Sequence, residues 1–328
     1  MTKKFLGTCA VVALISLNSF AAEPVRNKSL DRMMYTINPE IELSGPVFSD
    51  QSDAATKSKY GTELVRLILK EAHTQAASYL EAGDTQAYYA AMTLALTVPL
   101  QEGLYIQYRS VEGDVCRADA NNGELVRATG EANYSVFNQY FKTASMPFLP
   151  NCEEINSSKV TQIIRGGDGT DLSVMQVSIR WHFDDFLANK KYESVAATLQ
   201  YGISHLMKGF NPVYRNIGDY KCISERQGFF RKKKINYINL VRGVWAGQYN
   251  SGSIAQTCRF SDFGNKFKSH DVGFERNLNK ILDFNGTLSV DMVGDLTLDS
   301  DVAAAFKEVV TNLKENRNDR SALDRIVR

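Results

Sequence analysis

The side chains that could do chemistry in this chain are polar residues set into apolar runs. Glu102 continues the apolar stripe of a helix expected over residues 85–100, and Gln176 interrupts the apolar run 174–177. Burial disfavours the charged form of a carboxylate, and a carboxyl that keeps its proton near neutral pH can act as a general acid. The alternative for Glu102 is a solvent-exposed helix end, because Pro99 can end or kink the helix there.

A Tyr-Asn pair closes a second apolar run. Ile238, Val241 and Trp245 have the spacing of one buried helical face. The same face reaches Tyr249, and Asn250 follows it directly. The pair either lines a cleft at the end of this helix, or consists of a core tyrosine and a capping asparagine.

Acidic residues mark a glycine-rich turn between two β-rich runs. Residues 159–182 are expected to form a small hairpin whose tip carries Asp168 and Asp171. Aspartate is common in turns for structural reasons alone, so neither carboxylate indicates a site by itself.

Taken in chain order, these segments resemble the lysozyme-like superfamily that includes goose-type lysozymes and soluble lytic transglycosylases. That family has a helix ending in the catalytic glutamate, then a hairpin with Gly-Leu-Met-Gln, then a helix closing with Ala-Tyr-Asn-Ala-Gly. The matching segments here are Glu102, residues 174–177 and residues 248–252. Goose-type lysozymes also carry arginine and histidine soon after Met-Gln, as Arg180 and His182 do here.

The resemblance covers about residues 63–260 and implies a role for each matching residue. Glu102 would be the catalytic acid, and Tyr249 would hydrogen-bond to it. Met175 and Gln176 would line the sites beside the scissile bond, and Asn250 would help to build the sugar cleft.

Three departures from the family pattern concern the second carboxylate and the surroundings of the acid. Gly103 replaces the serine after the catalytic glutamate, and Ser173 replaces the glycine before Leu-Met-Gln. Ser178 stands where goose-type enzymes have an aspartate. Asp168 is the best replacement for that carboxylate by its position in the hairpin, and Asp171 is the second choice.

The substrate class that the resemblance implies is the β-1,4-linked glycan of peptidoglycan. With a second carboxylate to activate water, the enzyme would be an inverting glycoside hydrolase, a lysozyme or muramidase. Without one, it would be a lytic transglycosylase that leaves anhydromuramyl ends. The remaining alternative is a non-catalytic wall-binding module. No cofactor or metal is expected, and the oligomeric state is left open.

The N-terminus has the pattern of a cleaved secretory signal peptide over residues 1–22. Lys3 and Lys4 precede an apolar run from Phe5 to Leu17, and small residues come before Glu23. The run is shorter than the ~20 apolar residues of a membrane span. We therefore expect a secreted or periplasmic protein with no membrane span.

The charge of the chain is nearly balanced. The full chain has a net charge of +1, and loss of Lys3 and Lys4 leaves 36 basic and 37 acidic residues. Such a chain gains little from long-range attraction to polyanions, so no nucleic-acid partner is expected. The basic run 231–234 is interpreted as a solvated helix start.

The near-neutral charge also motivates a hypothesis about the substrate. A cationic surface, common in lysozymes, suits an anionic wall, whereas de-N-acetylated wall is less anionic. The layout also resembles predatory-bacterium lysozymes that act on deacetylated peptidoglycan, so we expect that substrate to be preferred.

The expected fold class is α+β and mostly helical: a lysozyme-like fold with a small β-hairpin and a helical C-terminal extension. The expected parts are an N-terminal arm (23–60), a catalytic domain (61–262) and the extension (263–328). Further helices are expected over residues 63–83, 184–208 and 302–316, the last capped by an aspartate such as Asp299.

Cysteine use agrees with export. The four cysteines beyond the leader allow three pairings, of which Cys116–Cys152 and Cys222–Cys258 are favoured because each closes a local loop. Metal ligation is the weaker interpretation, since no Cys-x-x-Cys pair is present.

Overall fold

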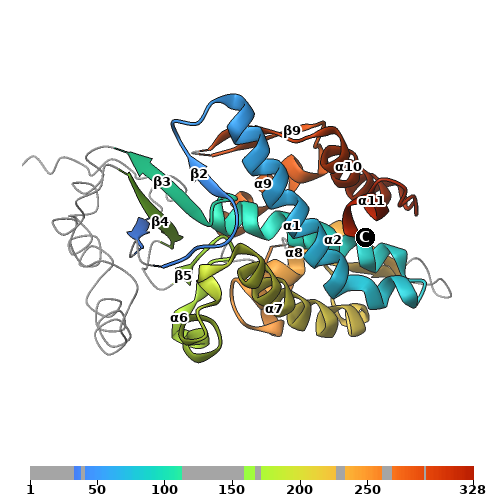
Figure 1. Ribbon diagram of the computed structural model, residues 1–328. Helices are drawn as coiled ribbons and strands as arrows, with labels where there is room; N and C mark the ends of the chain where they lie inside the picture. The colour runs from blue at the N-terminus through green and yellow to red at the C-terminus, as the bar shows by residue number, and fades with distance from the viewer. Residues whose placement is uncertain are drawn as a thin grey trace, which may run out of the picture.

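The computed structural model describes residues 33–37, 41–112, 159–166, 171–226, 233–260, 268–291 and 293–328. Within them the chain is mostly helical with three small sheets, which confirms the α+β, mostly helical class. The largest sheet lies at one end of the molecule, and the long helices extend away from it (Figure 1). None of the helices in these ranges is long and apolar enough to cross a membrane.

Helix α1 (Ala54–Glu81) begins earlier than residue 63 because Asp53 caps it. The Asp53 carboxylate accepts a hydrogen bond from the backbone N–H of Thr56 at 2.7 Å, and so satisfies a donor that the first turn leaves unpaired. The helix ends before Gly83, whose positive φ of 74° suits a chain reversal. Its buried face includes Leu64, Ile68 and Ala72.

Helix α2 (Thr85–Gly103) is the central helix of the fold. It is buried on nearly every side, as a core helix is. The alanine stripe in its sequence had suggested a helix buried on one side. Helices α1, α7, α8, α9 and α10 all pack against it. Pro99 does not end the helix, which continues to Gly103. The Pro99 carbonyl accepts the N–H of Tyr105 at 3.1 Å and so closes the last turn, beyond Glu102.

The expected small hairpin is part of a larger sheet. Strands β2 (Val47–Ser49), β3 (Tyr108–Glu112), β4 (Lys159–Arg165), β5 (Asp171–Leu172) and β6 (Val177–Ser178) follow in this order, with β1 (Met33–Thr36) also paired to β4. Only β2 and β3 run parallel.

Residues 173–176 form a tight turn between β5 and β6, so only Val177 of the apolar run 174–177 lies in a strand. Ser173 and Gln176 have positive φ values of 75° and 46°, which cannot continue a ladder. The short helix α6 (Ile179–His182) follows β6 at once. The expected single helix over 184–208 was also wrong: a π turn, η2 (Phe183–Ala188), and a 3-10 turn, η3 (Lys191–Glu193), come first.

Helix α7 (Val195–Arg215) starts at Ser194, whose side chain accepts the N–H of Ala197 at 3.3 Å. Its predicted stripe is buried, as expected: Val195, Leu199, Ile203 and Leu206. A short 3-10 turn, η4 (Ile217–Asp219), follows this helix.

The basic run leads into a strand rather than a helix. Strands β7 (Ser224–Arg226) and β8 (Lys233–Ile235) form a ribbon, and α8 (Tyr237–Val244) starts only at the Asn236 cap. The π turn η5 (Trp245–Tyr249) and the 3-10 turn η6 (Ile254–Gln256) complete this segment. The Cys222–Cys258 disulfide encloses it and confirms that pairing, whereas Cys116 and Cys152 lie outside the described residues.

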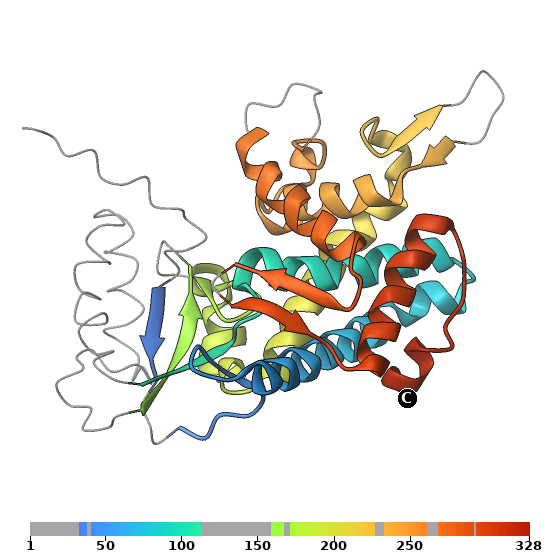
Figure 2. The same ribbon diagram turned by 90° about the horizontal axis from the view of Figure 1, so that it is seen from above.

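The C-terminal region consists of α9 (Lys268–Leu282), β9 (Thr287–Val290), β10 (Gly294–Thr297), α10 (Ser300–Glu315) and α11 (Leu323–Val327). Asp299 caps α10 through the N–H of Val302 at 2.8 Å, as expected. The β9–β10 ribbon, which the sequence did not predict, lies against α1, where Leu296 contacts Gly61 (Figure 2). The region therefore shares the core of α1 and α2.

Candidate functional site

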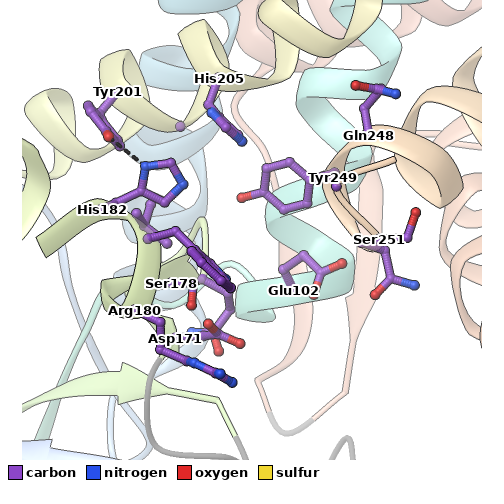
Figure 3. Close-up of a pocket in the computed structure, with 16 residues that line it drawn as sticks. Glu102, Asp171, Ser178, Arg180, His182, Tyr201, His205, Gln248, Tyr249 and Ser251 are labelled. Carbon is purple, nitrogen blue, oxygen red and sulfur yellow. Dashed lines mark hydrogen bonds between the residues drawn. The ribbon is translucent and has the colours of Figure 1, made fainter. Parts of the chain in front are cut away.

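A cleft of about 650 Å³ opens where the C-terminal end of α2 meets the β5–β6 turn, α6, α7 and η5. Figure 3 shows Glu102, Asp171 and Tyr249 around a common space, with His182 and His205 along one side of it. The lining also includes Gln176, Ser178, Arg180, Trp181, Tyr201, Gln248, Asn250 and Ser251.

A buried tryptophan holds Glu102 through a hydrogen bond. The indole Nε1–H of Trp245 donates to Glu102 Oε1 at 2.6 Å. Trp245 is only 3% exposed and stacks on Phe274 of α9, with ring centroids 4.4 Å apart and planes 9° from parallel. The donor is thus fixed by packing, and it fixes the position of the Glu102 carboxyl group.

Gly103 lets the turn 173–176 pack directly on the end of α2. A Cβ at Gly103 would lie 2.2 Å from the carbonyl oxygen of Val174, so any side chain there would displace the turn. The turn is held in place by the N–H of Val174, which donates to Gln107 Oε1 at 3.0 Å. Glycine at position 103 is therefore needed for a close backbone approach beside Glu102.

Met175 lies in the core rather than in the cleft. Its side chain is fully buried and covers Gly202 of α7, where a Cβ would come within 2.6 Å of it. Its carbonyl oxygen accepts the hydroxyl of Tyr249. Met175 therefore reaches the cleft only through its backbone.

Tyr249 is hydrogen-bonded to the turn 173–176 and not to the acid. Its hydroxyl donates its single proton to the Met175 carbonyl, so the direct donor to Glu102 is Trp245 instead of the expected tyrosine. Burial raises the pKa of Tyr249 well above its usual value, and the charges of Glu102 and Asp171 add to this. The phenol therefore stays protonated and serves as a hydrogen-bond donor.

Asp171 supplies the second carboxylate of the described cleft. It starts strand β5, where it pairs with Ser178. Gly166 leaves room for it, since a Cβ there would lie 3.1 Å from Asp171 Cβ and 2.8 Å from Gln176 Oε1. Gln176 Nε2 donates a hydrogen bond to the Ser173 carbonyl oxygen at 2.7 Å. Asp168 lies outside the described residues.

A row of aromatic rings forms the remaining side, and the sequence analysis named His182 of this row but not Tyr201 or His205. His182 Nδ1 and the Tyr201 hydroxyl are 2.8 Å apart, and the His182 and His205 rings have centroids 4.7 Å apart. The ring of His205 also faces Tyr249, at 6.3 Å. Tyr201 and His205 are four residues apart on α7, the spacing of one helical face, which is the only sequence signal for them.

Burial lowers the pKa of both cleft histidines. Partial desolvation is the main cause for His182, with Lys208 adding to it and Asp185 opposing it. Desolvation is again the main cause for His205, followed by the neighbouring His182 and by Lys208. Both rings are thus neutral at neutral pH and can each donate and accept one hydrogen bond.

The cleft joins two carboxylates with aromatic and amide groups, which suits general acid chemistry on a large polar ligand. Within the described ranges no three His, Cys, Asp or Glu side chains gather in a way that could hold a metal ion. Comparisons with protein-family models, curated proteins and solved structures found no match.

Proposed function

We propose that this protein is an exported peptidoglycan-degrading glycosidase of the lysozyme-like superfamily, with Glu102 as its general acid. The observation that carries the proposal is the Glu102 carboxyl group, held by Trp245 in a cleft that contains a second carboxylate, Asp171. The order of the Glu102, Gln176 and Tyr249-Asn250 motifs in the sequence supports the same family, and all of these residues line this cleft.

In the proposed reaction Glu102 protonates the glycosidic oxygen of a β-1,4 link in the glycan. The Trp245 N–H that contacts Oε1 orients the carboxyl group and stabilises the carboxylate that remains after the proton is transferred. The departing sugar leaves an oxocarbenium-like centre at the anomeric carbon, and water attacks that carbon from the opposite face. The balance of atoms is that of hydrolysis: water supplies a hydroxyl to the new reducing end and a proton to the base.

The base in this scheme is a hairpin aspartate. Asp171 favours hydrolysis over the transglycosylase route, because it provides a carboxylate that can take the proton from water. Inverting glycosidases hold the two carboxyl groups roughly 6.5–9.5 Å apart to make room for that water. Asp168, the first choice from the sequence, remains the alternative base.

Export and substrate preference belong to the same proposal. The Cys222–Cys258 disulfide supports an oxidising compartment, in keeping with the signal-peptide pattern and a secreted or periplasmic location. The near-neutral charge of the mature chain supports a preference for deacetylated peptidoglycan.

The test is digestion of purified peptidoglycan, native and chemically deacetylated, by the mature protein and by Glu102→Gln. We expect Glu102→Gln to lower the rate roughly 10²–10⁴-fold, the contribution of a positioned general acid. Glu63→Gln is the matched control, since Glu63 is exposed on α1 outside the cleft. Retained activity in Glu102→Gln overturns the assignment of the acid, and equal rates on both walls overturn the preference.

A further inference from the structure

Trp181 is the most exposed large hydrophobic side chain among the described residues. It is 78% exposed, and the others of this kind are the aliphatic Val47, Ile254 and Val272. It also lines the cleft that contains Glu102 and Asp171. Exposure of a large apolar ring to water is unfavourable. An exposed ring at a candidate binding site therefore indicates a ligand that covers the ring.

The backbone that carries Trp181 is fixed although its ring is not packed. Ile179, at the start of α6, is fully buried. On the other side His182 is tied to the Tyr201 hydroxyl at 2.8 Å. The indole is therefore presented at the edge of the cleft by anchored neighbours, which lowers the ordering cost of binding something to it.

The ring is supported on one side. The guanidinium carbon of Arg180 lies over the Trp181 ring at 5.7 Å from its centroid, a cation–π arrangement. The indole offers a flat apolar face with a polar N–H at its edge. The C–H groups of a pyranose can lie on such a face while its hydroxyls meet the N–H, the cleft carboxylates and water.

We propose that Trp181 binds substrate by stacking on a sugar ring of the glycan at one end of the cleft. This inference rests on the proposed function, because it names one contact of the same site. Polar groups that line the same cleft, among them Asp171 and Ser178, favour a sugar over an apolar protein segment or a lipid chain.

The experiment uses the full mature chain with Glu102→Gln, so that ligand is bound without turnover. The probe is a soluble β-1,4-linked tetrasaccharide of the peptidoglycan glycan, chemically de-N-acetylated like the wall that the proposed enzyme prefers. Calorimetry would compare this protein with versions that add Trp181→Ala, Trp181→Phe or Val272→Ala. Val272 is the control because it is exposed on α9 and lies outside the cleft.

A fluorescence readout reports on the ring itself. The chain has two tryptophans, and Trp245 is buried, so iodide quenching reports mainly on Trp181. Bound tetrasaccharide should protect this emission from iodide. Trp181→Ala should weaken binding by about tenfold or more, as expected for an aromatic hot spot. Trp181→Phe should restore most of the affinity, and Val272→Ala should leave it unchanged.

Each contrary result has a distinct meaning. Unchanged affinity in Trp181→Ala, or binding that leaves Trp181 open to iodide, overturns the stacking role and leaves the proposed glycosidase intact. Failure of the tetrasaccharide to bind any of the proteins also overturns the stacking role of Trp181. Digestion of whole peptidoglycan by the unmutated protein then decides whether the proposed glycosidase function is overturned as well.

Discussion

The two tryptophans of the chain lie at the same cleft, one buried and the other exposed to solvent. Trp245 is 3% exposed, stacked on Phe274 and hydrogen-bonded to Glu102. Trp181 is 78% exposed at the edge of the cleft, with Arg180 over its ring. We call the first region, with Glu102, Gly103 and Trp245, the floor, and the second, with Arg180 and Trp181, the rim.

The difference between floor and rim shows how one cleft holds a carboxyl group fixed by packing together with an exposed aromatic ring. At the floor, packing decides which atom faces Glu102, so the geometry is set before any ligand arrives. At the rim, the backbone is anchored and the side chain keeps its contact area for the ligand. Substitutions at the floor should therefore change stability and chemistry, and those at the rim should change affinity.

The largest contrast is expected in stability. Trp245→Ala should lower the free energy of unfolding by about 3–5 kcal/mol, because it empties a buried site and removes the stack on Phe274. Trp181→Ala should change it by less than about 0.5 kcal/mol, as for an exposed side chain. Urea unfolding followed by circular dichroism measures both, and similar losses at the two sites would remove the distinction.

The next effect is expected in catalysis by the floor. Trp245→Phe keeps an aromatic ring for Phe274 but deletes the N–H donor to Glu102, and a hydrogen bond to a charged group contributes about 1.5–3 kcal/mol. The rate of wall digestion should fall roughly 10–100-fold.

The pH profile of that variant separates this role from simple loss of packing. The indole N–H favours the charged carboxylate, so its loss favours the protonated acid, and the alkaline limb of the activity profile should move to higher pH. Trp181→Phe should leave the limb where it is. An unmoved limb in Trp245→Phe would mean that the hydrogen bond does not bear on the reacting proton.

A smaller loss of stability is expected from the close approach at the floor. Gly103→Ala places a Cβ 2.2 Å from the Val174 carbonyl and should cost about 1–3 kcal/mol of unfolding free energy through overpacking. Gly273→Ala in α9 is the control, since its Cβ would meet only the Gln101 side chain at 3.6 Å. That change should be neutral or stabilising, because alanine favours a helix over glycine. Equal stability of the two variants would refute the close packing.

The smallest effect concerns the histidines between floor and rim. The pKa values of His182 and His205 are lowered from 6.5 in the folded protein, so the unfolded chain binds more protons once the pH falls below that value. Stability should therefore be complete above about pH 6.5 and decrease as the pH drops through it. His205→Asn should lose part of this acid sensitivity in unfolding measured at about pH 8 and about pH 5. An unchanged difference between the two pH values would exclude His205 as a source.

Most of the polar residues of the cleft could be predicted from the sequence, but the contacts that hold them in place could not. Glu102, Asp171, Gln176, Tyr249 and Asn250 line one space because they sit at the ends of elements that converge there. Glu102 and Gln176 stand out from the sequence because each is polar in an apolar context, whereas Asp171 and Asn250 were assigned to a site through the family resemblance.

The missed features depend on backbone conformations and contacts that periodicity does not encode. The segment 173–176 is a turn because Ser173 and Gln176 have positive φ values, which the residue types there do not reveal. Trp245 was taken for core alone, because nothing in its spacing shows that the π turn after α8 points its N–H at Glu102. The contact of His182 with His205 joins separate helices and has no local pattern.

Product mass spectrometry after digestion of peptidoglycan in ¹⁸O-labelled water tests whether Glu102 drives hydrolysis of the glycan. We expect soluble fragments whose reducing ends carry one ¹⁸O atom, and the loss of these fragments with Glu102→Gln. Unlabelled anhydromuramyl ends would contradict hydrolysis in favour of transglycosylation, and no soluble fragments at all would contradict the enzyme.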